Sequence, residues 1–111
     1  MSGYYETKKT ATGKDMFNLK AGNHEVILTS ETYESKEAML NGIASVRQNG
    51  PNEASFEKKV SVRNEPYFVL KAANGQVIGK SEMYTSEAGR DNGIASVMRN
   101  SPTDKVVEAP V

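Results

Sequence analysis

Alternating apolar and polar positions predict three short strands in the first third of the chain. The strands cover residues 5–9, 16–21 and 25–31. In the middle one, Phe17 and Leu19 fall on one face of the strand and Lys20 falls on the other. We therefore expect an antiparallel sheet with one buried face and one wet, lysine-bearing face.

The spacing of apolar residues then changes to that of a helix. Met39, Ile43 and Val46 recur on one helical face, which predicts a helix over residues 36–49. Ser35 precedes it as an N-cap, and an Asn-Gly-Pro sequence ends it. The first half of the chain therefore has the order strand, strand, strand, helix.

The same pattern is present twice. The sequence Asn-Gly-Ile-Ala-Ser-Val at residues 41–46 returns at residues 92–97, and this offset of 51 residues pairs residues 5–51 with residues 56–102 without a gap. Of these 47 pairs, 21 are identical, against roughly 3 expected by chance from composition. The chain is therefore an internal duplication.

We expect an α+β fold of two tandem βββα repeats with antiparallel strands, related by a pseudo-twofold axis. A unit of about 50 residues buries too little surface to be stable alone. Repeat 1 (residues 4–51) and repeat 2 (residues 55–102) should therefore share a core within one compact domain, residues 1–111. The tail, residues 103–111, is expected to fray. Either one continuous sheet or two packed sheets would satisfy this pattern.

Gly42 and its counterpart Gly93 lie inside the predicted helices. A glycine there costs about 1 kcal/mol relative to alanine, and its neighbours in sequence are small. We expect the helix to approach a strand or its twin helix closely at this point. Gly42→Leu should then cost on the order of a few kcal/mol through overpacking, and an unchanged melting temperature would contradict this.

Composition excludes several classes of function. The 14 Lys and Arg residues balance the 14 Asp and Glu residues, so no global field attracts nucleic acid or membrane. Without cysteine there is no thiol chemistry, and one histidine, His24 in a predicted turn, makes neither a zinc site nor a catalytic pair. Residues 1–6 have neither the basic nor the apolar region of a signal peptide, and no stretch reaches about 18 apolar residues, so we expect neither export nor a membrane span. We expect a cytoplasmic protein without catalytic, cofactor or metal sites, and not an enzyme.

Some polar residues present in both copies have no evident structural role. Glu31, Tyr33 and Asn41 stand between the third strand and the first half of the helix, where nothing demands those residue types. Lys20 belongs to the wet face of the sheet. With their counterparts, the tentative binding residues are Lys20, Glu31, Tyr33, Asn41, Lys71, Glu82, Tyr84 and Asn92.

Three repeated motifs carry a resemblance to a known family. They are Leu-Lys-Ala at residues 19–21, Ser-Glu-x-Tyr-x-Ser at residues 30–35 and Asn-Gly-Ile-Ala-Ser-Val at residues 41–46, each with its image. In these the chain resembles the YegP-like proteins, also called UPF0339 or domain of unknown function 1508, in their duplicated subgroup. The resemblance implies a strand-strand-strand-helix unit and a bacterial cytoplasmic setting. It implies no activity, because the family has none assigned.

Two functions stay open at this point. The first is a non-catalytic interaction module with an unknown protein partner, or one that self-associates through an exposed sheet edge or face. The alternative is a weak nucleic-acid binder that lays the lysine-bearing face of its sheet on the duplex. Zero net charge, Glu6 and Glu57 among the lysines, and the lack of arginine on that face speak against it. The lysines concerned are Lys8, Lys20, Lys59 and Lys71.

Overall fold

The computed structural model describes residues 3–109 and shows an α+β fold in which both repeats have the predicted order of elements. Repeat 1 holds β1 (Tyr4–Lys9), β2 (Asp15–Lys20), β3 (Val26–Thr29) and α1 (Lys36–Asn49). A short 3-10 helix, η1 (Glu53–Ser55), leads into repeat 2. Repeat 2 holds β4 (Phe56–Val60), β5 (Pro66–Lys71), β6 (Val77–Lys80) and α2 (Glu87–Asn100), and a further strand, β7 (Val106–Glu108), follows.

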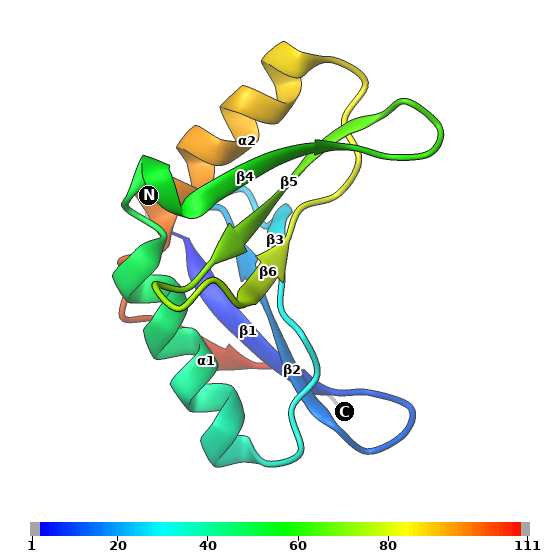
Figure 1. The fold of residues 1–111 in the computed structure, drawn as a ribbon. Coiled ribbons are helices and arrows are strands. Elements are labelled where there is room, and N and C mark those ends of the chain that lie inside the picture. The colour runs from blue at the N-terminus through cyan, green and yellow to red at the C-terminus, as the bar shows by residue number, and fades with distance from the viewer. Residues whose placement is uncertain (1–2, 110–111) are drawn as a thin grey trace.

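The two repeats merge by their edges into one continuous sheet. The strand order is β4-β5-β6-β3-β2-β1-β7, so β4 and β7 lie at opposite ends of the sheet (Figure 1). The junction is the antiparallel pair β3 and β6, which share a single residue pair, Thr29 with Lys80. Of the two arrangements that the sequence left open, the structure has the continuous sheet.

The core lies between the sheet and the two helices, and both repeats build it. Phe17 and Leu19 of β2 and Phe68 and Leu70 of β5 are fully buried in one hydrophobic cluster. Helix α1 contacts β2 of its own repeat and β6 of the other, while α2 contacts β5 and β3 in the same manner. Each helix therefore spans the junction, which gives two small half-cores one common interior.

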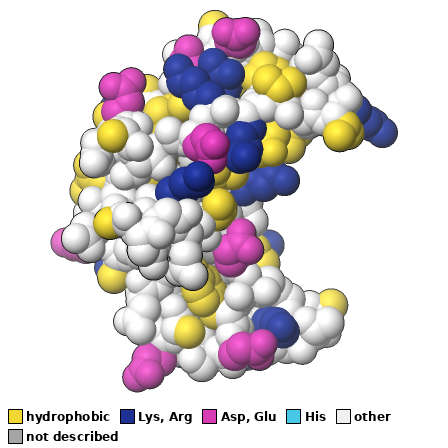
Figure 2. All heavy atoms as spheres, in the orientation of Figure 1, with side chains coloured by type: hydrophobic (Ala, Val, Ile, Leu, Met, Phe, Trp, Pro, Cys, Tyr) yellow, Lys and Arg dark blue, Asp and Glu magenta, His cyan; other side chains and the backbone are white. Residues whose placement is uncertain are grey.

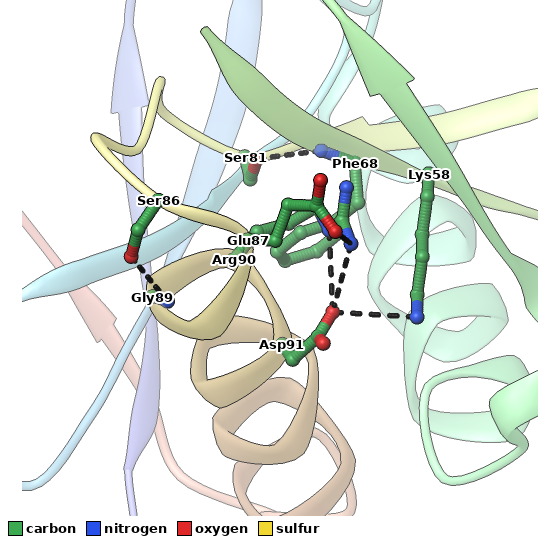
Figure 3. A network of polar contacts seen from close by, with 8 residues as sticks. All are labelled: Lys58, Phe68, Ser81, Ser86, Glu87, Gly89, Arg90 and Asp91. Atoms are coloured by element: carbon green, nitrogen blue, oxygen red, sulfur yellow. Dashed lines mark hydrogen bonds and ion pairs between the residues drawn. The ribbon is translucent and has the colours of Figure 1, made fainter.

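Serine side chains fix the start of each helix and the end of the third strand of each repeat. The hydroxyl of Ser35 accepts a hydrogen bond from the Ala38 amide at 3.1 Å, which confirms the predicted N-cap. Strand β3 ends at Thr29, two residues before the predicted end, because the Ser30 hydroxyl accepts the Phe17 amide hydrogen bond at 2.9 Å. A side chain thus takes the place of the next backbone partner in the ladder. Repeat 2 repeats both arrangements at Ser86 and Ser81 (Figure 3).

Gly42 does make room for a close neighbour, but the neighbour is neither a strand nor the twin helix. A methyl group on Gly42 would overlap the hydroxyl and the ring of Tyr33, which comes from the segment between β3 and α1. That ring stacks on Phe17 with their centroids 6.3 Å apart. Gly93 faces Tyr84 in the same way in repeat 2. The expected partner was wrong at Gly42 because an aromatic ring inserts between helix and sheet. At Gly93 a ring carbon of Phe68, on strand β5, also lies 3.2 Å from the position of an added methyl group.

The expectation that the tail frays is wrong for the residues that the structure describes. Strand β7 runs parallel to β1. The Tyr5 amide donates to the Lys105 carbonyl at 2.9 Å, and the Ala109 amide donates to the Thr7 carbonyl at 2.8 Å. Arg47 of α1 also donates to the Thr103 carbonyl at 2.8 Å. The unpaired backbone groups on the outer edge of β1 are what hold the tail. The last two residues, 110–111, lie outside the described residues.

Candidate binding cleft at the junction of the repeats

The sheet divides on either side of the single residue pair that joins the repeats. After Thr29 the chain continues alongside β2, where the Asp15 amide donates to the Tyr33 carbonyl at 2.9 Å. After Lys80 it continues alongside β5, where the Tyr84 amide donates to the Pro66 carbonyl at 2.9 Å. The two repeats therefore separate away from the junction, and α1 lies across the gap next to β6.

One side of this division forms a cleft of about 540 Å³ that is open to solvent. Repeat 1 contributes Glu31, Tyr33 and Asn41, three of the tentative binding residues. Repeat 2 contributes the turn before β6 and the start of that strand. The facing side chains are Asn74, Gln76 and Val77. The structure thus brings together residues that sequence reasoning singled out separately, and it adds a second wall.

Tyr33 is the most constrained side chain in the cleft. It is half-buried, with Phe17 on one side and Gly42 on the other. Burial raises the pKa of the Tyr33 hydroxyl, and the negative charge of Glu31 raises it further. The hydroxyl therefore keeps its proton at neutral pH and can donate a hydrogen bond. Glu31 and Asn41 are exposed, so the cleft presents donors and acceptors beside an aromatic ring.

Repeat 2 carries the equivalent residues, in a more acidic setting. Tyr84 lies against Gly93 as Tyr33 lies against Gly42. Burial raises the pKa of Tyr84, and the charges of Glu82 and Glu25 add to the effect. Glu25 occupies the position that Gln76 has in the other copy. Asn92, the image of Asn41, is exposed on α2. The two ends of the junction therefore share the tyrosine–glycine contact but differ in charge.

Lys20 and Lys71 do not belong to the cleft. They lie on the sheet face that the helices leave uncovered, where each pairs with a glutamate: Lys20 with Glu6 at 2.9 Å and Lys71 with Glu57 at 2.8 Å. The hydrogen bond to Glu6 raises the pKa of Lys20. The bond from Lys71 lowers the pKa of Glu57, helped by the charge of Lys59. These lysines are thus partly neutralised within the fold.

The uncovered face is also less wet than predicted. Asn18 on β2 and Val69 on β5 lie beneath the lysines and are 6% and 5% exposed. Lys and Arg side chains gather over β4 and β5 in Figure 2, with acidic side chains among them. Lys80 adds a cation 5.2 Å from the centre of the Tyr67 ring. Lysines on this face thus lie beside glutamates of opposite charge.

Sequence reasoning missed the repeat 2 wall of the cleft. Asn74 is a typical turn residue, and its side-chain oxygen accepts the Gln76 amide at 3.0 Å, so its sequence suggests no more than a turn. The one signal for a second role is Val77, an apolar residue that remains 37% exposed at the start of a central strand. Within residues 3–109, no group of His, Cys, Asp and Glu side chains could hold a metal ion.

Comparison with known proteins assigns the chain to a family. The domain of unknown function DUF1508 matches twice in tandem, over residues 10–57 and residues 61–108. The chain belongs to this family. Among its relatives, the UPF0339 protein of Shewanella oneidensis is 55% identical over 106 residues, 96% of each chain. The UPF0339 protein YegP of Yersinia pestis is 58% identical over 98 residues, 88% of each chain.

Members of the family with solved structures have the same architecture. The solution NMR structure of the Shewanella oneidensis UPF0339 protein superimposes with a TM-score of 0.91 at 54% identity, covering 97% of this chain and 92% of that one. The NMR structure of yegP from E. coli, a protein of unknown function, gives a TM-score of 0.92 at 48% identity, covering 97% and 93%. The two-repeat fold of this chain therefore matches more than nine tenths of each solved chain. No helix within residues 3–109 is long and apolar enough to cross a membrane.

Proposed function

We propose that this DUF1508 protein is a non-catalytic interaction module that binds a protein partner at the cleft between its repeats. The observation that carries the proposal is the meeting of Glu31, Tyr33 and Asn41 with Asn74 and the start of β6 across the junction. These side chains come from elements far apart in sequence and converge on one concave surface. Convergent polar groups beside apolar surface are what recognition sites require.

The shape of the cleft favours a protein over a small molecule. Small-ligand sites enclose roughly 70–90% of their ligand, whereas this cleft is wide open and has an exposed apolar residue, Val77, at its wall. The ring of Tyr33 offers a rigid amphipathic contact of the kind enriched at protein interfaces. The lining presents hydrogen-bonding groups and one carboxylate, which suit the binding of a partner and not catalysis.

A matched pair of variants tests this proposal. Asn41→Lys combined with Gln76→Lys places two new charges in the cleft, while Ala44→Lys combined with Gln48→Lys places two on exposed positions of α1 outside it. Proteins captured from a bacterial extract by immobilised wild type should be captured by the control pair and lost by the cleft pair. Both variants must first show the wild-type melting temperature. Equal capture by all three chains would contradict the proposal.

The nucleic-acid alternative has a separate test. Its support is the group of lysines over β4 and β5 together with exposed Lys80, and its weakness is that Glu57 pairs with both Lys59 and Lys71. Amide NMR spectra with and without short single- and double-stranded nucleic acids, at low and then physiological salt, decide the matter. Shifts on β4 to β6 that weaken steeply with salt would support nucleic-acid binding. Unchanged spectra at low salt would eliminate it.

A further inference from the structure

Because the chain is duplicated, the strand that covers the sheet edge of repeat 1 indicates what could bind to the same edge of repeat 2. β1 and β4 are equivalent strands with the same register on their inner neighbours, Tyr5 opposite Leu19 and Phe56 opposite Leu70. The outer edge of β1 is covered by β7, whereas β4 is the last strand at the other end of the sheet within residues 3–109 (Figure 1). We call the outer side of β4, residues Phe56–Val60, the open edge.

Strand β7 shows how an added strand pairs with such an edge. It runs parallel to β1, with the Tyr5 amide donating to Lys105 and the Thr7 carbonyl accepting from Ala109. Since backbone groups alternate in direction along an antiparallel strand, the equivalent outward groups of β4 belong to Phe56, Lys58 and Val60. The Phe56 amide already donates to the Glu53 carbonyl in η1. The usable part of the open edge therefore begins at the Phe56 carbonyl.

We propose that the open edge binds an extended segment of another protein as an eighth, parallel strand. The segment carries an apolar residue beside Phe56 and an acidic residue two positions later, opposite Lys58. This is the pattern of β7, where Val106 pairs with Tyr5 and Glu108 with Thr7. Strand addition of this kind obtains affinity from main-chain hydrogen bonds and specificity from alternate side chains. The site is separate from the cleft between the repeats.

A pocket next to β4 supplies the apolar contact. It has a volume of about 190 Å³ and lies between the strand, η1 and α2. Phe56 and Ile94 form its apolar walls, and Glu53, Lys58 and Asp91 form its rim. In a parallel strand, the residue next to Phe56 points to the same side of the sheet as the Phe56 ring. A valine or leucine at that position of the segment would therefore enter this pocket.

Lys58 is the cation at the open edge that can face an acidic residue of the segment. Lys58 is exposed on β4, whereas Lys59 is half-buried on the opposite face of the strand and pairs with Glu57. Lys58 contacts Asp91 at 3.3 Å, and Arg90 shares the same carboxylate oxygen at 3.2 Å (Figure 3). Asp91 is thus already balanced by Arg90, which leaves the charge of Lys58 available to a second carboxylate. Thr7 is the image of Lys58, so this preference belongs to repeat 2 alone.

A second copy of the chain fits the open edge poorly. In antiparallel pairing of two β4 strands, the central register sets Lys58 opposite Lys58, although Glu57 then lies opposite Lys59 on either side of that pair. Shifting the register by one pair in either direction sets Glu57 opposite Glu57 or Lys59 opposite Lys59. Like charges directly opposite each other destabilise a sheet, and lysine on an edge strand is a common protection against self-pairing.

The test uses a synthetic peptide with the sequence of residues 103–109, capped at both ends, added to the labelled full-length chain. The chain's own tail holds the β1 edge at a high effective concentration, so the peptide should reach only the open edge. We expect saturable NMR shifts at the amides of Lys58 and Val60. A peptide with Glu108→Lys should bind about two- to fivefold more weakly.

Two variants at one position separate backbone pairing from other causes. Lys58→Pro removes the outward amide without removing a hydrogen bond to β5 and should abolish the saturable shifts. Lys58→Thr keeps the amide but loses the charge, so it should retain saturable shifts with an affinity about two- to fivefold weaker, as for the Glu108→Lys peptide. If Lys58→Pro does not fold, slower hydrogen exchange of the wild-type Lys58 amide with peptide serves instead. The proposal is overturned by no saturable shift, by shifts confined to β1, or by concentration-dependent self-association that Lys58→Thr retains and Lys58→Pro abolishes.

Discussion

The contact between Gly42 and Tyr33 predicts opposite effects for one substitution made at two helical glycines. At Gly42 an added methyl group would overlap the Tyr33 hydroxyl and the adjacent ring carbon. At Gly89, in the first turn of α2, the nearest atom to an added methyl carbon is the Ser86 hydroxyl at 3.4 Å, an ordinary contact. Gly42→Ala and Gly89→Ala therefore differ in packing, although the chemical change is identical.

The magnitudes decide the sign of each effect. Alanine improves a helix by up to about 1 kcal/mol relative to glycine, and this gain applies at both positions. At Gly42 it is opposed by an overpacking cost of about 1–3 kcal/mol, because Tyr33 must leave its stacked position on Phe17. We expect Gly42→Ala to lower the free energy of unfolding by up to about 2 kcal/mol. Gly89→Ala should raise it by about 0.4–1 kcal/mol.

Urea unfolding followed by circular dichroism measures both free energies on the same scale. The melting temperature should fall by several degrees in Gly42→Ala and rise in Gly89→Ala, since 1 kcal/mol corresponds to about 4 °C or slightly more in a chain of this size. Tyr33→Leu in the Gly42→Ala background should recover part of the loss, because it removes the ring that the methyl group meets. Equal stabilisation by both alanines would refute the packing argument.

Three further predictions use other contacts. Ser30→Ala should lower the free energy of unfolding by about 1–3 kcal/mol, measured in urea, because a buried backbone amide loses its acceptor. Arg90→Met, which copies the residue at Met39, should leave stability unchanged or raise it, whereas a loss of about 3 kcal/mol would show that the buried guanidinium is required. Glu57 should titrate below the usual value of about 4.3 in carbon-detected NMR, and Lys71→Met should move its pKa back up. Its contribution to stability is present above the unfolded pKa and is lost as the pH falls through the lower folded one.

Local patterns predicted most of the secondary structure because the signals in them are local. The period-two stretch around Phe17 is β2, and the helical spacing from Met39 to Val46 is α1. Ser35 caps the helix as its residue type and place indicate. Because the chain is duplicated, each of these predictions also applies to the equivalent element of repeat 2. Such features depend on side chains a few residues apart, which is the range that sequence patterns describe.

The features that were missed depend on contacts between distant segments. One residue pair, Thr29 with Lys80, joins the repeats, and neither residue carries a pattern that distinguishes a merged sheet from two packed ones. Strand β7 is three residues long and is held by an edge about 100 residues earlier in the chain. The repeat 2 wall of the cleft exists only because the sheet divides at that pair. Tertiary pairing determines these features, and local propensity carries no information about it.

Differences between the two copies indicate which surfaces have separate roles. A fold with a pseudo-twofold axis gives equivalent positions nearly the same backbone environment, so a divergence between copies is informative where the structure shows a different neighbour at the two positions. Met39 and Arg90 diverge where α2 gains the ion pair between the buried Arg90 and the exposed Asp91. Thr7 and Lys58 diverge where β7 covers one edge and leaves the other to solvent. The tyrosine and glycine pair, in contrast, is kept in both copies because it shapes the same helix contact twice. If the open edge binds an acidic segment, Lys58 is the divergence that makes the two edges chemically distinct.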